Sequence, residues 1–525
     1  MNKRLQASLP LLPDITLLAM CAAVLSAQLF IRPFIGLADN GDFSKVTGRL
    51  SLAPEFDVPN FTYVVPVYVR SHNYRWYSDF LTSETLPAAF ASALEKTTGP
   101  PNEFDIRYMG AVHAIIFFLA FVVFLFSWRH TPPLLRFSTT GFALFVFTDV
   151  MYTSYYNSYY SDTIALLSLL WMVVLGLLII STAEQSPFWL FVFAVAAGLF
   201  VTSKAQHALA GWIPAVFLAR VAWQNKKHRI IAGALALLVV IGSALQVRST
   251  PSWVKGMTAF DVVFHQITLG SPHSSADLRE LGLDGTYDQY VGQYAYMKGS
   301  PAQNPDWARE FHQTVGYGVI TRFYLRHPYR TLAILDKNLK QNAIHLRPIA
   351  NFCLGDGHPP RAITHAYAVW SDLKTRTVRF WPECIIAWYA VFVLVSTFHL
   401  RNSRIVSERN ATLLALGVCL LGLYEFGVAT LADAAETGRH LFLFHACTDV
   451  TVCFAVAGIA IWTRELLHKV LLFESSDRLF IRLEVDQEAH GRVSRIDPSQ
   501  SPSCESCGLG RRHPFSCSPS SKETP

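Results

Sequence analysis

The chain has 525 residues, of which 51% are hydrophobic and only 16% are charged, and its mean hydropathy is +0.28. This composition excludes an ordinary soluble enzyme of the same length and is typical of a membrane protein. The formal net charge of +6 comes mostly from basic residues in short connections and does not indicate nucleic-acid binding.

The apolar residues are gathered into about ten runs, each near the length needed to cross the roughly 30 Å hydrocarbon core of a bilayer. A backbone exposed to lipid must satisfy its own hydrogen bonds, which excludes an open sheet and favours helices. The sequence therefore predicts an all-α polytopic membrane protein with about ten transmembrane helices. Their centres lie near Val24, Phe118, Leu144, Trp171, Val195, Pro214, Leu237, Phe392, Val418 and Val456.

Basic residues mark alternate connections between the predicted helices. They fall on one side of the membrane if the helices alternate in direction, and the positive-inside rule makes that side cytoplasmic. Both termini are then cytoplasmic, and the first helix, which lacks a clear small-residue cleavage site, is expected to stay uncleaved. The residues concerned are Lys3, Arg4, Arg129, Arg136, Arg220, Lys226, Lys227, Arg229, Arg401, Arg404, Arg409, Arg464 and Lys469.

Two long segments, residues 38–107 and 248–379, are expected on the extracytoplasmic side. The first contains a predicted surface helix at Pro87–Lys96. The second contains a predicted helix at Gly316–Gln341, which is either an ordinary amphipathic helix or a basic platform for lipid phosphates.

The chain is predicted to divide into a membrane domain, residues 1–470, and a cytoplasmic, largely disordered tail, residues 471–525. The tail contains a C-x-x-C pair, Cys504 and Cys507. Because a lone pair of this kind is weak evidence for a zinc site, no metal is predicted there.

The most informative motif, Asp39-Asn40-Gly41-Asp42, follows the first apolar run where the chain leaves the membrane. A lipid-carried substrate presents its polar head at this surface, which favours a catalytic role for the two carboxylates. The structural alternative is a turn, because Asn-Gly favours positive φ and an aspartate is able to N-cap a following helix.

Further charged residues arrive at the same side from other predicted helices. Lys204 and His207 lie between the fifth and sixth helices, against the positive-inside bias, and Arg439 and His440 precede the tenth. The structural interpretations are a snorkelling lysine and an ion pair between Glu436 and Arg439. The functional interpretation is a clamp for a phosphate.

Together these groups fit a reaction in which a hydroxyl attacks and a phosphate leaves. The hydroxyl needs a general base, and Asp39 is slightly favoured over Asp42 as the residue nearer the membrane, although the sequence does not separate the two. The leaving phosphate needs positive charge. The sequence has no P-loop and no G-x-G-x-x-G after a strand, which argues against a soluble nucleotide donor.

Several short motifs are similar to those of a known superfamily. They are Leu37–Phe43, Tyr156–Asp162, Ser203–Gln206, Asn351-Phe352 with Pro359-Pro360, and Glu436–His440. On these motifs the chain resembles the GT-C superfamily of multi-spanning glycosyltransferases, in particular bacterial glycan-biosynthesis hexose transferases of the surface-layer glycan type. In layout the resemblance covers most of residues 10–465.

The resemblance implies a membrane glycosyltransferase that moves a hexose from a polyprenyl-phosphate-linked donor to a cell-envelope glycan or lipid-linked acceptor, on the extracytoplasmic face of a bacterial plasma membrane. It implies that Asp39 or Asp42 is catalytic; a divalent cation is allowed but not required. The residues expected to bind the donor phosphate are Lys204, His207, Arg439 and His440. Those expected to contact substrate are Asn40, Asn157, Tyr160, Asp162, Gln206 and Glu436.

The alternative class is a polytopic transporter or a lipid or glycan flippase. Asp149 and Glu425, both in or beside apolar runs, would then mark a proton path. Against this reading, the chain has no convincing internal repeat and its outer segments are large and unequal. A scaffold protein is a third reading, which leaves the outer charges unexplained.

Overall fold

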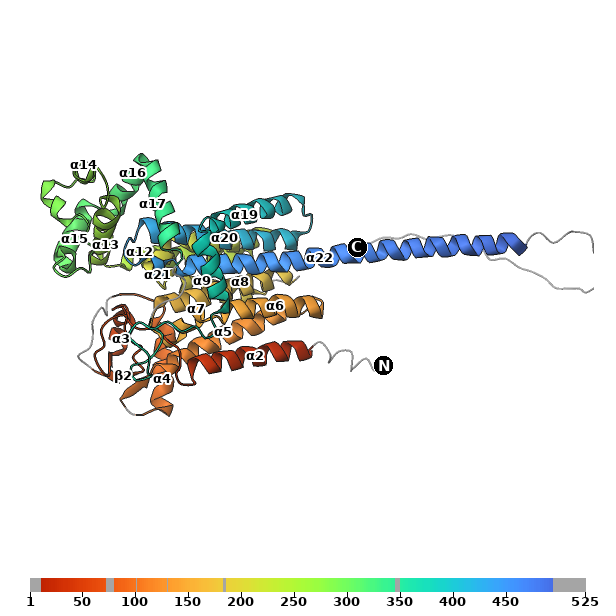
Figure 1. Ribbon diagram of the computed structural model, residues 1–525, viewed down its shortest axis with the longest axis horizontal. Coiled ribbons are helices and arrows are strands. Elements are labelled where there is room, and N and C mark those ends of the chain that lie inside the picture. The colour runs from red at the N-terminus through yellow and green to blue at the C-terminus, as the bar shows by residue number, and fades with distance from the viewer. Residues whose placement is uncertain are drawn as a thin grey trace, which may run out of the picture. The chain divides into compact units, whose positions relative to one another are not determined.

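A computed structural model of the chain describes residues 11–71, 80–100, 102–129, 131–182, 186–344 and 350–493. The chain divides into two compact units, Met1–Ile461 and Trp462–Pro525. The helical bundle and the candidate site lie in the first unit (Figure 1).

All ten predicted apolar runs are helical, which confirms the predicted polytopic helical fold. The most buried of the candidate spans is α8, which packs against α5, α9 and α20. Its sequence is apolar on all sides, as expected for a helix surrounded by other helices. The ten helices are α2 (Leu11–Leu29), α5 (Arg107–Ser127), α6 (Pro133–Phe147), α8 (Ser161–Ser181), α9 (Pro187–Val201), α11 (Trp212–Gln224), α12 (Arg229–Ser249), α19 (Cys384–Asn402), α20 (Val406–Leu431) and α22 (Phe442–Val493).

Among the described residues, seven helices are long and apolar enough to cross a membrane, and the number rises to eight if a bent pair counts as one span. The bent pair joins α6 to α7 (Val150–Thr153) and η1 (Ser154–Asn157) at 51°. The bend falls where Asp149 leaves the helical conformation and its carboxylate caps α7 by accepting from Met151 N. The two remaining runs, α9 and α11, are helices of 15 and 13 residues, shorter than a full span.

The first long segment contains two helices and a small antiparallel sheet that the sequence did not indicate. The strands are ordered β1-β2-β3, with Leu52 opposite Arg70 and Val67 opposite Asp105. The predicted helix at Pro87–Lys96 is confirmed as the central part of α4. The elements are α3 (Ser44–Leu50), β1 (Leu52–Pro54), β2 (Val67–Arg70), α4 (Thr85–Thr98) and β3 (Glu103–Asp105).

The second long segment is helical and packs around its own apolar core, which includes Phe260, Phe264 and Phe311. In Figure 1 both long segments lie at the same end of the helical bundle. The elements are α13 (Ser252–Phe260), η3 (Asp261–Ile267), α14 (Ser274–Glu280), η4 (Gly285–Tyr290), η5 (Pro301–Gln303), α15 (Pro305–Thr314), α16 (Tyr317–Arg326), α17 (Pro328–Gln341) and α18 (Val369–Phe380). Short elements between the spans are α10 (Ala205–Ala208), η2 (Leu209–Gly211) and α21 (Thr437–His440).

The single helix predicted at Gly316–Gln341 is wrong, because the structure has two helices, α16 and α17, with His327 between them. Pro328 explains the break: proline lacks the N–H that would continue α16, but it is well suited to the first turn of a new helix. Basic side chains of this region pair with acidic ones, as in the 2.7 Å contact of Arg330 with Asp277. These pairs favour the amphipathic-helix interpretation over the phosphate platform.

Candidate functional site

The Asp39–Asp42 motif forms a tight turn between α2 and α3. Gly41 has a φ of 108°, so the predicted positive-φ turn is confirmed. One carboxylate oxygen of Asp39 accepts the N–H groups of Gly41 and Phe43 at 2.7 and 3.1 Å. The predicted N-cap by Asp42 is wrong, because the N-cap of α3 is Phe43 and the helix has no side-chain cap. The Asp42 carboxylate is therefore available for partners outside the turn.

Two residues that the resemblance implies for substrate contact also contact the backbone at and before the turn. The Tyr160 hydroxyl donates to the carbonyl of Ala38 at 2.9 Å. The buried Asn157 amide donates to the carbonyls of Leu29 and Ile35, at 3.1 and 2.8 Å, where the chain leaves α2. Buried amides and hydroxyls with backbone partners of this kind fix chain geometry.

Another segment completes this support. The N–H of Ala38 donates to the carbonyl of Ala350 at 3.1 Å, and the Asn351 amide donates to the carbonyl of Gly36 at 3.2 Å. The structure therefore brings the Asn351 motif directly beside the turn.

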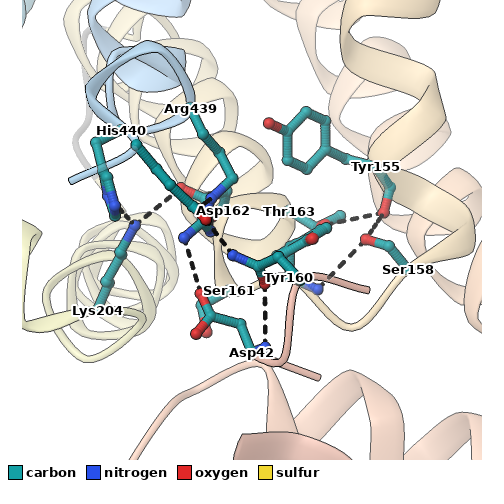
Figure 2. Close-up of polar contacts among 12 residues, drawn as sticks. Asp42, Tyr155, Ser158, Tyr160, Ser161, Asp162, Thr163, Lys204, Arg439 and His440 are labelled. Atoms are coloured by element: carbon teal, nitrogen blue, oxygen red, sulfur yellow. Dashed lines mark hydrogen bonds and ion pairs between the residues drawn. The ribbon is translucent and has the colours of Figure 1, made fainter. Parts of the chain in front are cut away.

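Arg439 joins the turn to the far end of the chain. Its guanidinium contacts Asp42 at 2.9 Å, Glu436 at 3.0 Å and Asp162 at 3.8 Å, and it lies 5.2 Å from the centre of the Tyr160 ring (Figure 2). The planar fork of an arginine suits such simultaneous contacts. Three segments distant in sequence therefore meet at one side chain.

Glu436 carries backbone strain at this junction. It has a φ of 52°, in the left-handed region that a non-glycine residue rarely adopts. Its carboxylate accepts from Arg439 and also from the Asn40 amide at 2.9 Å. The predicted Glu436–Arg439 pair is present, and the same carboxylate also contacts the Asp39–Asp42 turn through Asn40.

Lys204 and His440 form the other half of the cluster. The Lys204 ammonium donates to Nδ1 of His440 at 2.8 Å and lies 3.6 Å from Asp162 (Figure 2). Nε2 of His440 lies 3.3 Å from Asp433. Burial lowers the pKa of Lys204, opposed by Asp162, and burial raises the pKa of Asp433 to about 6. The cluster thus holds two partly buried cations, Lys204 and Arg439, between several carboxylates.

His207 and Gln206 lie behind this cluster and are already paired. Nδ1 of the buried His207 lies 2.9 Å from Glu425, and the Gln206 amide donates to Glu425 at 2.8 Å and to the carbonyl of His440 at 3.1 Å. Glu425, a proton-path residue in the transporter reading, is thus fully engaged, and Asp149 caps α7. Both carboxylates have structural partners that account for their burial.

The two carboxylates of the turn differ in their protonation. Burial raises the pKa of Asp39 to about 6, even though two backbone N–H groups stabilise its charged form. Burial acts in the same direction on Asp42, but the positive charges of Lys45 and Arg439 hold its pKa well below the usual range. The Lys45 contact with Asp42 is 2.6 Å long. The pKa of Asp39 is therefore raised, whereas that of Asp42 is lowered.

A cavity of about 480 Å³ opens beside Arg439. Its walls come from three parts of the chain: the first outer segment, the connection before α21, and the second outer segment. Sequence reasoning did not find its residues from the second outer segment, because the polar ones in α17 look like the polar face of an amphipathic helix and those at η3 carry no local pattern. Those lining residues are His265, Gln266, Leu269, Ile334, Lys337, Asn338, Gln341 and Asn342.

Among the described residues, no group of three or more His, Cys, Asp or Glu side chains is arranged to hold a metal ion. The acidic residues of the cluster face cations instead, as in the pairing of Asp42 with Lys45 and Arg439. The C-x-x-C pair at Cys504 and Cys507 lies outside the described residues.

The chain belongs to the family of the YfdI N-terminal transmembrane domain, whose model matches residues 2–475. No curated protein matches the chain. Solved structures that it resembles include those of the Archaeoglobus fulgidus oligosaccharyltransferase. The apo form matches with 12% identity and a TM-score of 0.39, over 87% of this chain and 51% of that one.

A structure of the archaeal enzyme AglB with an inhibitory peptide and a dolichol-phosphate matches with 12% identity and a TM-score of 0.36, over 87% and 51% of the two chains. A third, tethered to an acceptor peptide, has 14% identity and a TM-score of 0.37, over 87% and 50%. The chain thus spans about half the length of these proteins. At this level of similarity no argument rests on these matches.

Proposed function

We propose that this protein is a membrane glycosyltransferase that moves a hexose from a polyprenyl-phosphate-linked donor to a cell-envelope glycan or lipid-linked acceptor. The observation that carries the proposal is the cluster around Arg439, in which carboxylates and cations from four distant segments meet at one end of the spanning helices. Ionisable groups are costly at such a position and are retained where they act on a substrate.

In this proposal Asp39 is the general base. A base works best when its pKa lies near the operating pH, and the pKa of Asp39 is raised to about 6. Asp42 is a weaker candidate because its charge is stabilised by Lys45 and Arg439, which lowers its basicity. Its role is to hold Arg439 in position through the 2.9 Å contact.

The chemical step is a direct displacement at the anomeric carbon. An acceptor hydroxyl loses its proton to Asp39 as its oxygen forms a bond to the anomeric carbon. The bond from that carbon to the phosphate oxygen breaks, and the lipid phosphate leaves with the electron pair. One displacement inverts the configuration at the anomeric carbon.

The departing lipid phosphate gains negative charge and needs cations near it. Arg439 and Lys204 supply that charge, and both are held in place before the substrate arrives. His440, which accepts from Lys204, orients the ammonium. Such preorganised charge costs no rearrangement during the reaction, which is why it lowers the barrier.

The proposed cellular setting is a bacterial plasma membrane, with both termini in the cytoplasm and the cluster on the extracytoplasmic face. The positive-inside distribution of basic residues supports this orientation. The lipid-linked donor would then present its phosphate at the membrane surface beside the turn.

The proposal is tested by single Asp39→Asn and Asp42→Asn variants of the full chain in proteoliposomes. Polyprenyl-phosphate-linked glucose, galactose and mannose serve as donors, and transfer of labelled hexose to cell-envelope glycan is measured. We expect transfer by the wild type and a loss of roughly 10²–10⁴-fold in Asp39→Asn. Undiminished transfer in both single variants and in the double variant refutes the enzyme proposal.

A further inference from the structure

The cavity beside Arg439 differs in character from the ionic cluster. It has a volume of about 480 Å³, within the roughly 300–1,000 Å³ usual for small-molecule sites. One wall, formed by α17 and its C-cap residue, includes Asn338, Gln341 and Asn342. Arg439 lines the cavity and also belongs to the cluster, so the two spaces share one side chain.

We propose that this cavity holds the hexose of the lipid-linked donor, with the phosphate beside Arg439 and the sugar ring extending towards η3 and α17. This inference rests on the proposed function. It adds a sugar subsite to the proposed base and phosphate-binding groups. His265 is the residue of this subsite that the experiment below tests.

The cavity is placed correctly for such a ligand. The N–H of Phe61, which lines the cavity, donates to the backbone carbonyl of Asp39 at 2.8 Å. The proposed base and the cavity wall therefore belong to one hydrogen-bonded unit. Glu436 and Arg439 line the same space. A sugar in the cavity would keep its anomeric carbon between the phosphate and the turn.

Two polar atoms on separate walls lack hydrogen-bond partners. Within the described part of the chain, neither Nη1 of Arg439 nor Nδ1 of His265 has a hydrogen-bond partner, although both atoms are buried. A buried polar atom left unsatisfied costs about 1–3 kcal/mol, so a ligand that the two side chains meet when they turn towards the cavity is favoured. Nη1 of Arg439 faces Asp162 at 3.8 Å, beyond hydrogen-bond distance. A phosphate oxygen suits Arg439, and a sugar hydroxyl, which both donates and accepts, suits either protonation state of His265.

The charge balance favours a neutral polyhydroxylated group rather than a second phosphate. The Asn338 amide donates to the carbonyl of Ile334 and accepts from Asn342, so the uncharged groups that this wall offers a ligand are the Gln341 amide and the Asn342 oxygen. Glu436 would repel a further anion at one wall, and Lys337 is exposed rather than buried against the ligand. Phe61 adds an aromatic face, a usual component of small-molecule sites that also hold a few polar groups.

The test compares two lipids that differ only in the sugar. Binding of polyprenyl phosphate and of polyprenyl-phosphate-glucose, -galactose and -mannose is measured with the full chain in lipid nanodiscs. His265→Ala is expected to weaken binding of the preferred hexose-bearing lipid roughly fivefold to a hundredfold and to leave binding of polyprenyl phosphate unchanged. His265→Gln, which keeps a hydrogen-bonding group of similar reach, is expected to recover part of the loss.

The chain offers a matched control in His312. This residue belongs to the same outer segment, is also partly buried, and its Nδ1 likewise lacks a hydrogen-bond partner among the described residues, but it does not line the cavity. His312→Ala is expected to change neither affinity, whereas Arg439→Lys is expected to weaken both lipids. Equal effects of His265→Ala on the two lipids, or none on either, overturn the sugar subsite alone. A wild type that binds neither lipid refutes the proposed function and the subsite together.

Discussion

The assignment of Asp39 as the base predicts a specific pH dependence. With a pKa of about 6, a carboxylate is roughly nine-tenths ionised at pH 7 and roughly one-tenth ionised at pH 5. Because only the ionised form accepts a proton, the transfer rate at low donor concentration should be about tenfold lower at pH 5 than at pH 7. Asp42, whose pKa is held well below its usual range, stays ionised at both values.

The variant Asp39→Asn isolates this effect from the structure of the turn. The amide keeps an oxygen in the place of the one that accepts from Gly41 and Phe43, so the turn is expected to persist. The rate of transfer should fall roughly 10²–10⁴-fold, and the remaining activity should lose the acidic limb of its pH profile, that is, the fall in rate at low pH. Rates are measured from pH 5 to 8.5 in proteoliposomes, with the preferred hexose-bearing lipid as donor.

Asp433 is the necessary control, because burial raises its pKa to about 6 as well. Asp433→Asn should keep the acidic limb if Asp39 is the base. A wild-type rate that is flat from pH 5 to pH 7 would refute the reasoning and point to Asp42. If only Asp433→Asn abolishes the fall in rate at low pH, the group that titrates belongs to the His440–Asp433 pair and not to Asp39.

Two predictions concern stability and are checked by thermal unfolding in detergent. Gly256→Ala would place a Cβ 1.8 Å from the backbone oxygen of Ala308 and push α13 away from α15, which should lower the free energy of unfolding by about 1–3 kcal/mol. The control is Gly233→Ala, whose Cβ would meet no atom of the described residues within 4 Å and should not destabilise the protein. Equal melting temperatures for the two variants would contradict this packing. Asp449→Asn would leave Lys374, which lies 2.6 Å from the Asp449 carboxylate, as a buried unpaired charge, and should lower the free energy of unfolding by about 3–5 kcal/mol. The double variant with Lys374→Met should regain most of that stability. No recovery in the double variant would argue against the ion pair.

Apolar length and local chemistry were sufficient to predict much of the fold from the sequence. A run of about twenty apolar residues has few alternatives to a transmembrane helix, so the helical bundle was predictable. The turn at Asp39–Asp42 was predictable as well, because glycine at positive φ is a local preference. The break at Pro328 is also a local signal, which the amphipathic pattern of the surrounding residues concealed.

The site depended on contacts that no local pattern encodes. The hydrogen bond from Asn40 to Glu436 joins residues 396 positions apart, and Arg439 contacts both Asp42 and Asp162. The alternation of predicted spans was sufficient to place the ionisable residues at one end of the bundle. It could not assign partners, because each pairing depends on how separate helices pack.

The sequence by itself determined the class of protein and the position of the turn, since both follow from apolar length and backbone preference. The tertiary structure alone separated Asp39 from Asp42, because their pKa values depend on burial and on cations brought from elsewhere in the chain. It also gave Asn157 a structural contact with the backbone, and it formed the cavity beside Arg439 from three distant segments. Burial and long-range pairing are properties of the packed molecule, which is why the residues alone left these roles open.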